Sequence, residues 1–179
     1  MTWKQEKLLA QIDTVRALGD LVVVSGGLVW HIMSPDHIEK KIVHDHSDID
    51  LFALPDKAGE VIARLKDLRF NRYWTKYATP NFYRYGKTEN YRGKRVKVLI
   101  DLFIQDVPSI RVRDFNIVEP KFLLTLYETT HSSKNCTAVK NATILIKKGI
   151  DPVWRPELIG ERENKWVGKS DINKYYNCE

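Results

Sequence analysis

Two aspartates separated by one residue stand in an apolar stretch of the chain, Asp48-Ile49-Asp50-Leu51-Phe52. Because side chains on a β-strand alternate between its faces, Asp48 and Asp50 would share one face while Ile49 and Leu51 point into the core. Two neighbouring carboxylates repel each other, and partial burial raises that cost. A divalent cation removes the cost, since Mg²⁺ binds one or two carboxylates together with phosphate oxygens of a substrate. The pair therefore indicates a metal site for a phosphate substrate, with a purely structural pair as the alternative.

A third aspartate, Asp101, lies in the middle of the apolar run Val96–Ile104. An acid inside such a strand has no obvious partner among its sequence neighbours, and burying a lone carboxylate is costly. If this strand pairs with the strand that carries Asp48 and Asp50, the three carboxylates converge. Three acids on two adjacent strands are typical of a two-metal site: two bridge the ions, and the third ligates one ion and faces the attacking hydroxyl. A capped or edge position is the alternative for Asp101.

A short β-branched run, Val22–Val24, ends in Ser25-Gly26-Gly27 and leads into a helical pattern. A strand that ends in glycines and enters a helix leaves free backbone N–H groups, which bind phosphate oxygens. Glycine lets the phosphate approach closely, and Ser25 adds a hydroxyl donor. The segment is not a Walker loop, because no Gly-Lys-Ser/Thr follows, and no GxGxxG is present. A bare Gly-Gly is a weak signal, and its value comes from its position just upstream of the aspartate pair.

Hydrophobic periodicity predicts the elements that would position these residues. Helices are expected over residues 3–18, 28–33, 57–68, 120–130 and 135–148. Strands are expected over residues 21–24, 48–54 and 96–104, with further strands and a loop over 70–95. Polar residues 36–47 read as a loop, and the last 28 residues or so read as irregular. The order predicts an α+β (α/β-like) fold: a mixed β-sheet core over residues 1–107, flanked by helices, and a helical C-terminal segment over 108–179 packed on it.

The composition is that of an ordinary globular domain, with 43% hydrophobic and 29% charged residues among 179. The net charge of +6 suits anionic ligands such as triphosphates or RNA, and a charged solvated surface explains it equally well. Two cysteines without a CxxC pattern argue against a disulfide framework and a zinc site. The first 21 residues lack the apolar region of a signal peptide, and no stretch has the length of a membrane span. A cytoplasmic location is therefore expected.

Taken together, the motifs resemble the nucleotidyltransferase superfamily related to DNA polymerase β. That family has Gly-Gly or Gly-Ser at the start of a helix, then Asp-hydrophobic-Asp/Glu on a strand, then a third acid on a later strand. Gly26-Gly27, Asp48-Ile49-Asp50 and Asp101 match this pattern in order. The sequence is most similar to the small antibiotic nucleotidyltransferases and the abortive-infection toxin nucleotidyltransferases, which often read His-x-Asp-Ile-Asp, as residues 46–50 do here. The resemblance covers roughly residues 20 to 104.

The resemblance implies an enzyme that transfers a nucleoside monophosphate from a nucleoside triphosphate, ATP among the candidates, to a hydroxyl acceptor and releases pyrophosphate. Asp48, Asp50 and Asp101 would bind Mg²⁺ (or Mn²⁺). Asp101 would either bind the second ion or act as general base, although a free aspartate with a pKa of ~3.9 is a poor base near neutral pH. Residues 25–27 (Ser25, Gly26 and Gly27) would hold the β- and γ-phosphates.

The acceptor is left open by the sequence. Residues 69–95 are rich in arginine, lysine and aromatic side chains, a combination that grips single-stranded nucleic acid. A twisted hairpin explains the same composition, because aromatic residues favour strands. An RNA or tRNA end and a small hydroxylated molecule are therefore both candidate acceptors. A catalytically inactive nucleotide- or RNA-binding module of the same fold is the alternative function.

Overall fold

The computed structural model describes residues 3–33, 42–44, 47–76, 79–129 and 165–167. The helices of this part are α1 (Trp3–Leu18), α2 (Leu28–Met33), α4 (Ala58–Asp67) and α5 (Pro120–Thr129), with a 3₁₀ turn over Gly19–Leu21. The strands are β1 (Val23–Ser25), β2 (Ile42–His44), β3 (Ile49–Ala53), β4 (Asn71–Tyr73), β5 (Phe82–Tyr91), β6 (Lys94–Ile104), β7 (Ser109–Val112), β8 (Phe115–Val118) and β9 (Lys165–Val167).

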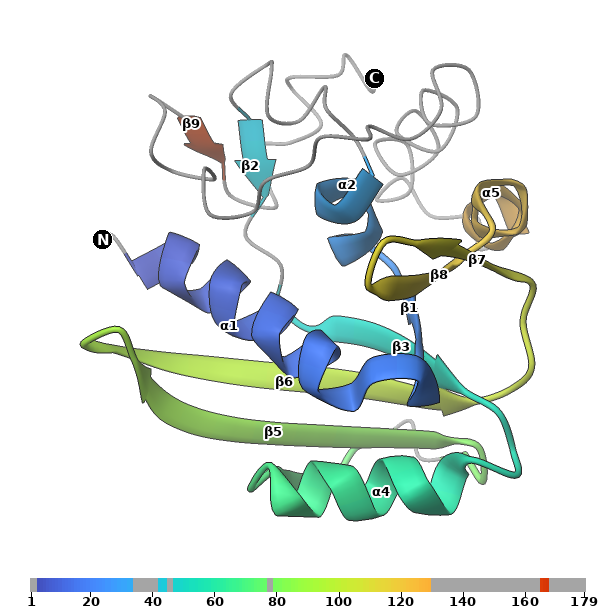
Figure 1. The fold of residues 1–179 in the computed structure, drawn as a ribbon, viewed down its shortest axis with the longest axis horizontal. Coiled ribbons are helices and arrows are strands. Elements are labelled where there is room, and N and C mark those ends of the chain that lie inside the picture. The colour runs from blue at the N-terminus through green and yellow to red at the C-terminus, as the bar shows by residue number, and fades with distance from the viewer. Residues whose placement is uncertain (1–2, 34–41, 45–46, 77–78, 130–164, 168–179) are drawn as a thin grey trace.

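Seven of the strands form one mixed sheet in the order β4-β5-β6-β3-β1-β8-β7. The strand β3 lies parallel to β6 and antiparallel to β1, and β1 is in turn parallel to β8. Figure 1 shows the long strands β5 and β6 beside the shorter β3, with helices around them. The predicted α+β class with a mixed sheet flanked by helices is confirmed.

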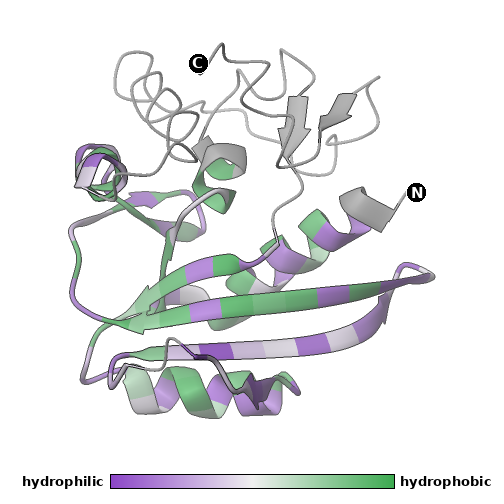
Figure 2. Ribbon diagram, turned by 180° about the vertical axis from the view of Figure 1, so that it is seen from behind, coloured by the Kyte–Doolittle hydropathy of each residue, from purple (hydrophilic) through white to green (hydrophobic). Residues whose placement is uncertain are grey.

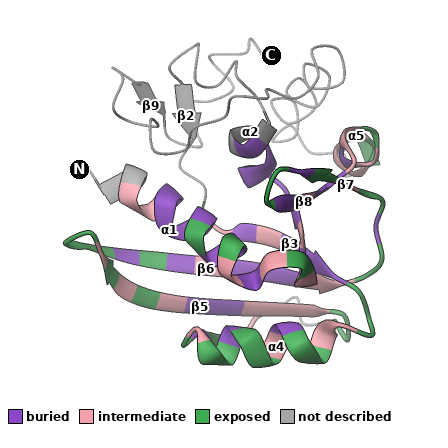
Figure 3. Cartoon of the chain, in the orientation of Figure 1, coloured by how far each residue is buried: buried purple, intermediate pink, exposed green. Residues whose placement is uncertain are grey.

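One side of the sheet is buried beneath α1 and α4. Alternate residues of β6 on this side have no solvent exposure, namely Val96, Val98, Ile100 and Leu102, and Figure 3 shows the alternation along the strand. The helix α1 contacts β6 and β5, and the Arg64 side chain of α4 donates a hydrogen bond to the Ala17 carbonyl at the end of α1. Figure 2 shows the molecule from behind, where the sheet lies in front of α1.

The other side of β6 carries the polar residues. Arg95 and Lys97 are exposed there, and Asp101 follows on the same side because side chains alternate along the strand. The turn that joins β5 to β6 has two residues, Arg92 and Gly93, both with positive φ. Positive φ at both central residues of a two-residue hairpin loop is typical of a type I′ turn, which fixes the register of the two strands that it connects.

Two strand pairs were not expected from the sequence. Residues 109–118 form the hairpin β7–β8, and β8 pairs with β1 inside the main sheet, where Ile117 and Val118 are fully buried. Residues 42–44, predicted to be loop, form β2, which pairs in parallel with β9. Each of these strands has only three or four residues. The pairings of β8 with β1 and of β2 with β9 join segments that are distant in sequence, so no local periodicity marks them. The division into residues 1–107 and 108–179 stays a prediction, and the helix expected over 135–148 lies outside the described residues.

No helix of the described residues is long and apolar enough to cross a membrane.

The buried side of the sheet makes a prediction about stability. The substitution Leu102→Ala is expected to lower the free energy of unfolding by about 2–5 kcal/mol, because it leaves a cavity where the side chain has no solvent exposure. The same substitution at Leu54, which is 42% exposed, is the matched control and is expected to cost only ~0.5 kcal/mol. Urea denaturation of both variants measures the difference. Equal losses would contradict the placement of Leu102.

Candidate active site

Four polar residues lie in one row across four adjacent strands. Arg84 on β5 is the register partner of Asp101 on β6, and Asp101 is the partner of Asp50 on β3. Asp50 is in turn the partner of Ser25 on β1. Register partners point to the same side of a sheet, with Cβ atoms about 4.5–5.5 Å apart in an antiparallel pair. The row therefore brings Ser25 and two of the three predicted aspartates together.

The third predicted aspartate, Asp48, directly precedes β3. The Ser47 hydroxyl donates a hydrogen bond of 2.8 Å to its Oδ1. Its other carboxylate oxygen, Oδ2, lies 3.4 Å from Nη2 of Arg84. Asp48 therefore joins the row through Arg84, and all three predicted acids lie around one place on the sheet.

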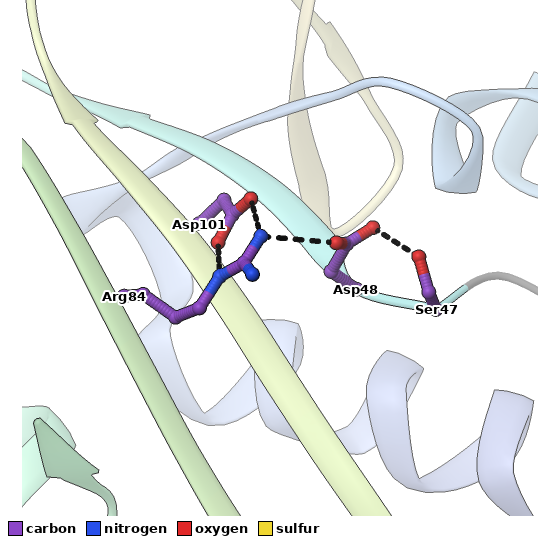
Figure 4. Close-up of polar contacts among 4 residues, drawn as sticks. All are labelled: Ser47, Asp48, Arg84 and Asp101. Atoms are coloured by element: carbon purple, nitrogen blue, oxygen red, sulfur yellow. Dashed lines mark hydrogen bonds and ion pairs between the residues drawn. The ribbon is translucent and has the colours of Figure 1, made fainter. Parts of the chain in front are cut away.

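The Arg84 guanidinium lies between two of these acids (Figure 4). Its Nε donates to Oδ1 of Asp101 at 2.6 Å, and its Nη2 donates to Oδ2 of Asp101 at 2.5 Å. This is the fork geometry that makes arginine–carboxylate pairs strong. The hydrogen bond to Asp101 raises the pKa of Arg84, burial opposes that rise, and the charges of Asp101, Asp48 and Asp50 add to it. Arg84 is thus the cation that these acids hold in the structure.

The predicted glycine segment lies directly against the row. Gly26 has a φ of +63°, a conformation that favours glycine, and a Cβ built on it would lie 1.9 Å from Oδ2 of Asp50. Ser25, the residue before Gly26, is buried, with 5% of its surface exposed. Gly27 follows directly and leads into α2 at Leu28. Only a residue without a side chain lets this backbone approach the Asp50 carboxylate.

The helix α5 also reaches the row. Burial raises the pKa of Tyr127, and the negative charge of Asp50 raises it further. The tyrosine hydroxyl is therefore a neutral group near Asp50. The sequence predicts a helix over 120–130, where α5 covers Pro120–Thr129, and gives no signal that its tyrosine lies by the acids.

Arg84 was not singled out from the sequence, although a signal for it exists. Tyr91 and Lys94 flank the Arg92-Gly93 turn and are register partners. Arg84 and Asp101 lie at equal distances along the chain from this turn, so a two-residue hairpin loop places them opposite each other. Recognising the positive-φ turn would have been sufficient to pair them. His46, which belongs to the His-x-Asp-Ile-Asp motif, lies outside the described residues.

The acids are suitable in kind for a divalent cation. Carboxylate oxygens are the ligands that Mg²⁺ and Mn²⁺ prefer, and the carboxylates of Asp48 and Asp101 together carry more negative charge than the one guanidinium between them. The Asp50 carboxylate lies directly against the Gly26 backbone, in the space that a Cβ on this residue would take. Among the described residues, the structure places no group of three Asp, Glu, His or Cys side chains in an arrangement that could hold a metal ion. Both oxygens of Asp101 accept hydrogen bonds from Arg84 in this arrangement.

The contact between Gly26 and Asp50 predicts that Gly26→Ala costs more stability than an equivalent change elsewhere. Gly19 is the matched control, with a φ of +58° and no atom within 4 Å of an added Cβ. In both variants the left-handed backbone conformation lowers the free energy of unfolding, because it costs an L-residue about 1–2 kcal/mol. Gly26→Ala must in addition displace the Asp50 carboxylate, at a further ~1–3 kcal/mol. Urea denaturation compares the two, and equal losses would show that Asp50 does not contact Gly26.

Comparisons with known proteins concern the fold. No family model matches the chain, and no curated protein matches it by sequence. The structure of JHP933 from Helicobacter pylori aligns with a TM-score of 0.50 at 13% identity, over 80% of this chain and 73% of JHP933. A protein from H. pylori named as a candidate nucleotidyltransferase aligns at 0.49 and 16% identity, over 69% of this chain and 56% of that one. ANT(2")-Ia, solved in complex with adenylyl-2"-tobramycin, aligns at 0.45 and 16% identity, over 95% of both chains.

At identities under 25%, these similarities extend to the fold and not to the activity. The two alignments with TM-scores under 0.5 are too loose to support an inference about the site. The alignment with JHP933 shows that the chain shares its fold with that protein.

Proposed function

We propose that the chain is a nucleotidyltransferase: it transfers a nucleoside monophosphate from a nucleoside triphosphate to a hydroxyl acceptor and releases pyrophosphate. The observation that carries the proposal is the contact between Gly26 and Asp50 in a row that continues to Asp101. Acids that could hold a metal and the glycine segment that the sequence predicts to bind phosphate thereby lie side by side. Neither feature alone specifies the chemistry, and their contact is what a metal-bound triphosphate requires.

Asp48, Asp50 and Asp101 are the residues that would hold Mg²⁺ or Mn²⁺. Such an ion, when bound, stabilises negative charge on phosphate oxygens and lowers the pKa of a bound hydroxyl. Asp50 and Asp101 are register partners on adjacent strands, and Asp48 is two residues before Asp50. The sheet thus fixes two of the acids and the turn before β3 supplies the third.

Ser25, Gly26 and Gly27 would bind the phosphates that leave. The backbone N–H groups of such a segment donate to phosphate oxygens, and glycine permits the close approach. The Ser25 hydroxyl lies in the same row as the acids, because Ser25 is the register partner of Asp50. Pyrophosphate bound here would be held on the β1 side of the acids.

The reaction forms one bond and breaks one. The acceptor oxygen attacks the α-phosphorus, and the bond from this phosphorus to the oxygen that bridges to the β-phosphate breaks. The acceptor proton passes to a carboxylate of the row, with Asp101 as the candidate. Positioning supplies much of the rate enhancement in such a displacement, since the protein holds both partners in line.

The aromatic and basic side chains at the β4 edge of the sheet favour an RNA end as the acceptor. Tyr73 on β4 is the register partner of Arg84, which extends the row to the edge of the sheet. The Lys97 ammonium lies 5.2 Å from the centre of the Tyr73 ring, and Trp74 is 86% exposed. Exposed aromatic rings next to cations stack bases and pair with phosphates. A small hydroxylated molecule is the other candidate class of acceptor.

The cytoplasmic location stays a prediction.

A second function has one observation in its favour. Arg84 already neutralises Asp101 and contacts Asp48, as a site that no longer binds metal would show. The chain would then be a nucleotide- or RNA-binding module without activity. A labelling assay separates the two functions.

The assay supplies each of the four α-labelled nucleoside triphosphates in turn, with Mg²⁺ and a cell extract separated into RNA and small-molecule fractions. We expect label in the RNA fraction with the wild-type protein. Label in the small-molecule fraction would instead identify a small acceptor. Retention of the labelled nucleotide by the protein without any transfer would support the inactive module.

The variant Asp50→Asn is expected to lower transfer by ~10²-fold or more, because loss of one carboxylate removes several kcal/mol of charge stabilisation. Asp106→Asn is the matched control, since Asp106 is exposed just beyond β6 and lies outside the row. Transfer should be unchanged in this control. Near wild-type transfer by Asp50→Asn would rule out the role proposed for the acids.

A further inference from the structure

Arg84 holds oxygens of two of the acids that would bind a metal ion. Both oxygens of Asp101 accept hydrogen bonds from its guanidinium, at 2.6 and 2.5 Å, and Oδ2 of Asp48 lies 3.4 Å away. The Asp101 side chain is only 11% exposed, so water has little access to these oxygens. A divalent cation could bind Asp101 only by taking oxygens that the guanidinium holds.

The Arg84 guanidinium contacts two carboxylates. Asp101 accepts two hydrogen bonds from it, and Oδ2 of Asp48 lies 3.4 Å from its Nη2. One positive charge against these two negative charges leaves the pair of acids attractive to a further cation. The Arg84 side chain is 34% exposed, which gives it room to leave the acids without unfolding the strand that carries it.

We propose that Arg84 is a positioning residue that holds the acids as a substitute cation and moves to a phosphate oxygen when a metal-bound triphosphate arrives. This inference rests on the proposed function, because it assigns a role to Arg84 at the same site. The triphosphate brings enough negative charge to hold both the metal and the displaced guanidinium. Metal alone brings no such anion, so it must displace Arg84 without compensation.

The consequence is a coupling between metal and triphosphate. Metal alone competes with Arg84 for the carboxylates and therefore binds weakly. Metal together with triphosphate gives Arg84 a new partner and therefore binds tightly. Removal of the guanidinium should therefore change the two affinities in opposite directions. A guanidinium that serves only the fold gives no reason for opposite changes.

The test uses Arg84→Met, which keeps the length of the side chain and removes its charge. Electron paramagnetic resonance measures the binding of Mn²⁺ alone, and we expect at least tenfold tighter binding in Arg84→Met than in the wild type. Calorimetry measures the affinity for Mn²⁺ together with inorganic tripolyphosphate, a triphosphate that has no nucleobase. We expect this affinity to fall at least fivefold in the same variant.

Arg72→Met is the matched control, since Arg72 lies on the other side of the sheet, 4.6 Å from the centre of the Tyr83 ring. Neither affinity should change in this variant. Arg84→Lys keeps a charge and loses the fork, so Mn²⁺ alone should bind with intermediate affinity. It also tests the proposal if Arg84→Met does not fold, which circular dichroism would show.

Unchanged Mn²⁺ affinity in Arg84→Met, or a change of both affinities in the same direction, would overturn the proposal. These readouts do not require turnover. If the labelling assay finds no transfer while the two affinities change in opposite directions, the proposed function fails and the role of Arg84 stands. If transfer occurs and the affinities do not change, the proposed function stands and the role of Arg84 fails.

Discussion

The parallel pairing of β3 with β6 is the contact on which the site depends. It places Asp50 opposite Asp101, and it is held by buried apolar residues on the other side of the sheet. Ile49 and Leu51 on β3 and Ile100 and Leu102 on β6 are all without solvent exposure. A shift of one residue would turn this apolar set to the polar side of the sheet, so the hydrophobic effect fixes the register of the acids.

The two neighbours of this pair add what the acids need. On one side, β5 brings Arg84, whose fork neutralises Asp101. On the other side, β1 brings Ser25 and the turn at Gly26, whose missing side chain makes room for Asp50. The same row thus has the Arg84 guanidinium beside Asp101 and the glycine segment, the predicted phosphate-binding backbone, beside Asp50. Such an arrangement suits a ligand that is itself part metal and part phosphate.

The sequence alone singles out the acids because the patterns that mark them are local. Asp48 and Asp50 share a face by strand alternation, and Asp101 stands out within an apolar run. Arg84 was missed because its importance depends on a partner across a hairpin, and one arginine in a basic segment carries no signal by itself. The strands β2, β8 and β9 were missed for the same reason, since each is defined by a partner that is distant in sequence. The Gly-Gly motif was read as a phosphate-binding segment, and the structure adds that Gly26 is needed for the approach of Asp50.

The pairing of β1 with β8 has a consequence for how the chain can be divided. The short strand β1 has β3 on one side and β8 on the other, and β8 comes from residues 115–118. A fragment that ends at residue 107 would leave β1 as an unprotected edge, with unpaired backbone groups next to Ser25 and Gly26. Exposed edges of this kind recruit strands from other molecules. The part of the chain that carries the acids therefore depends on the part that follows it for its solubility as well as its shape.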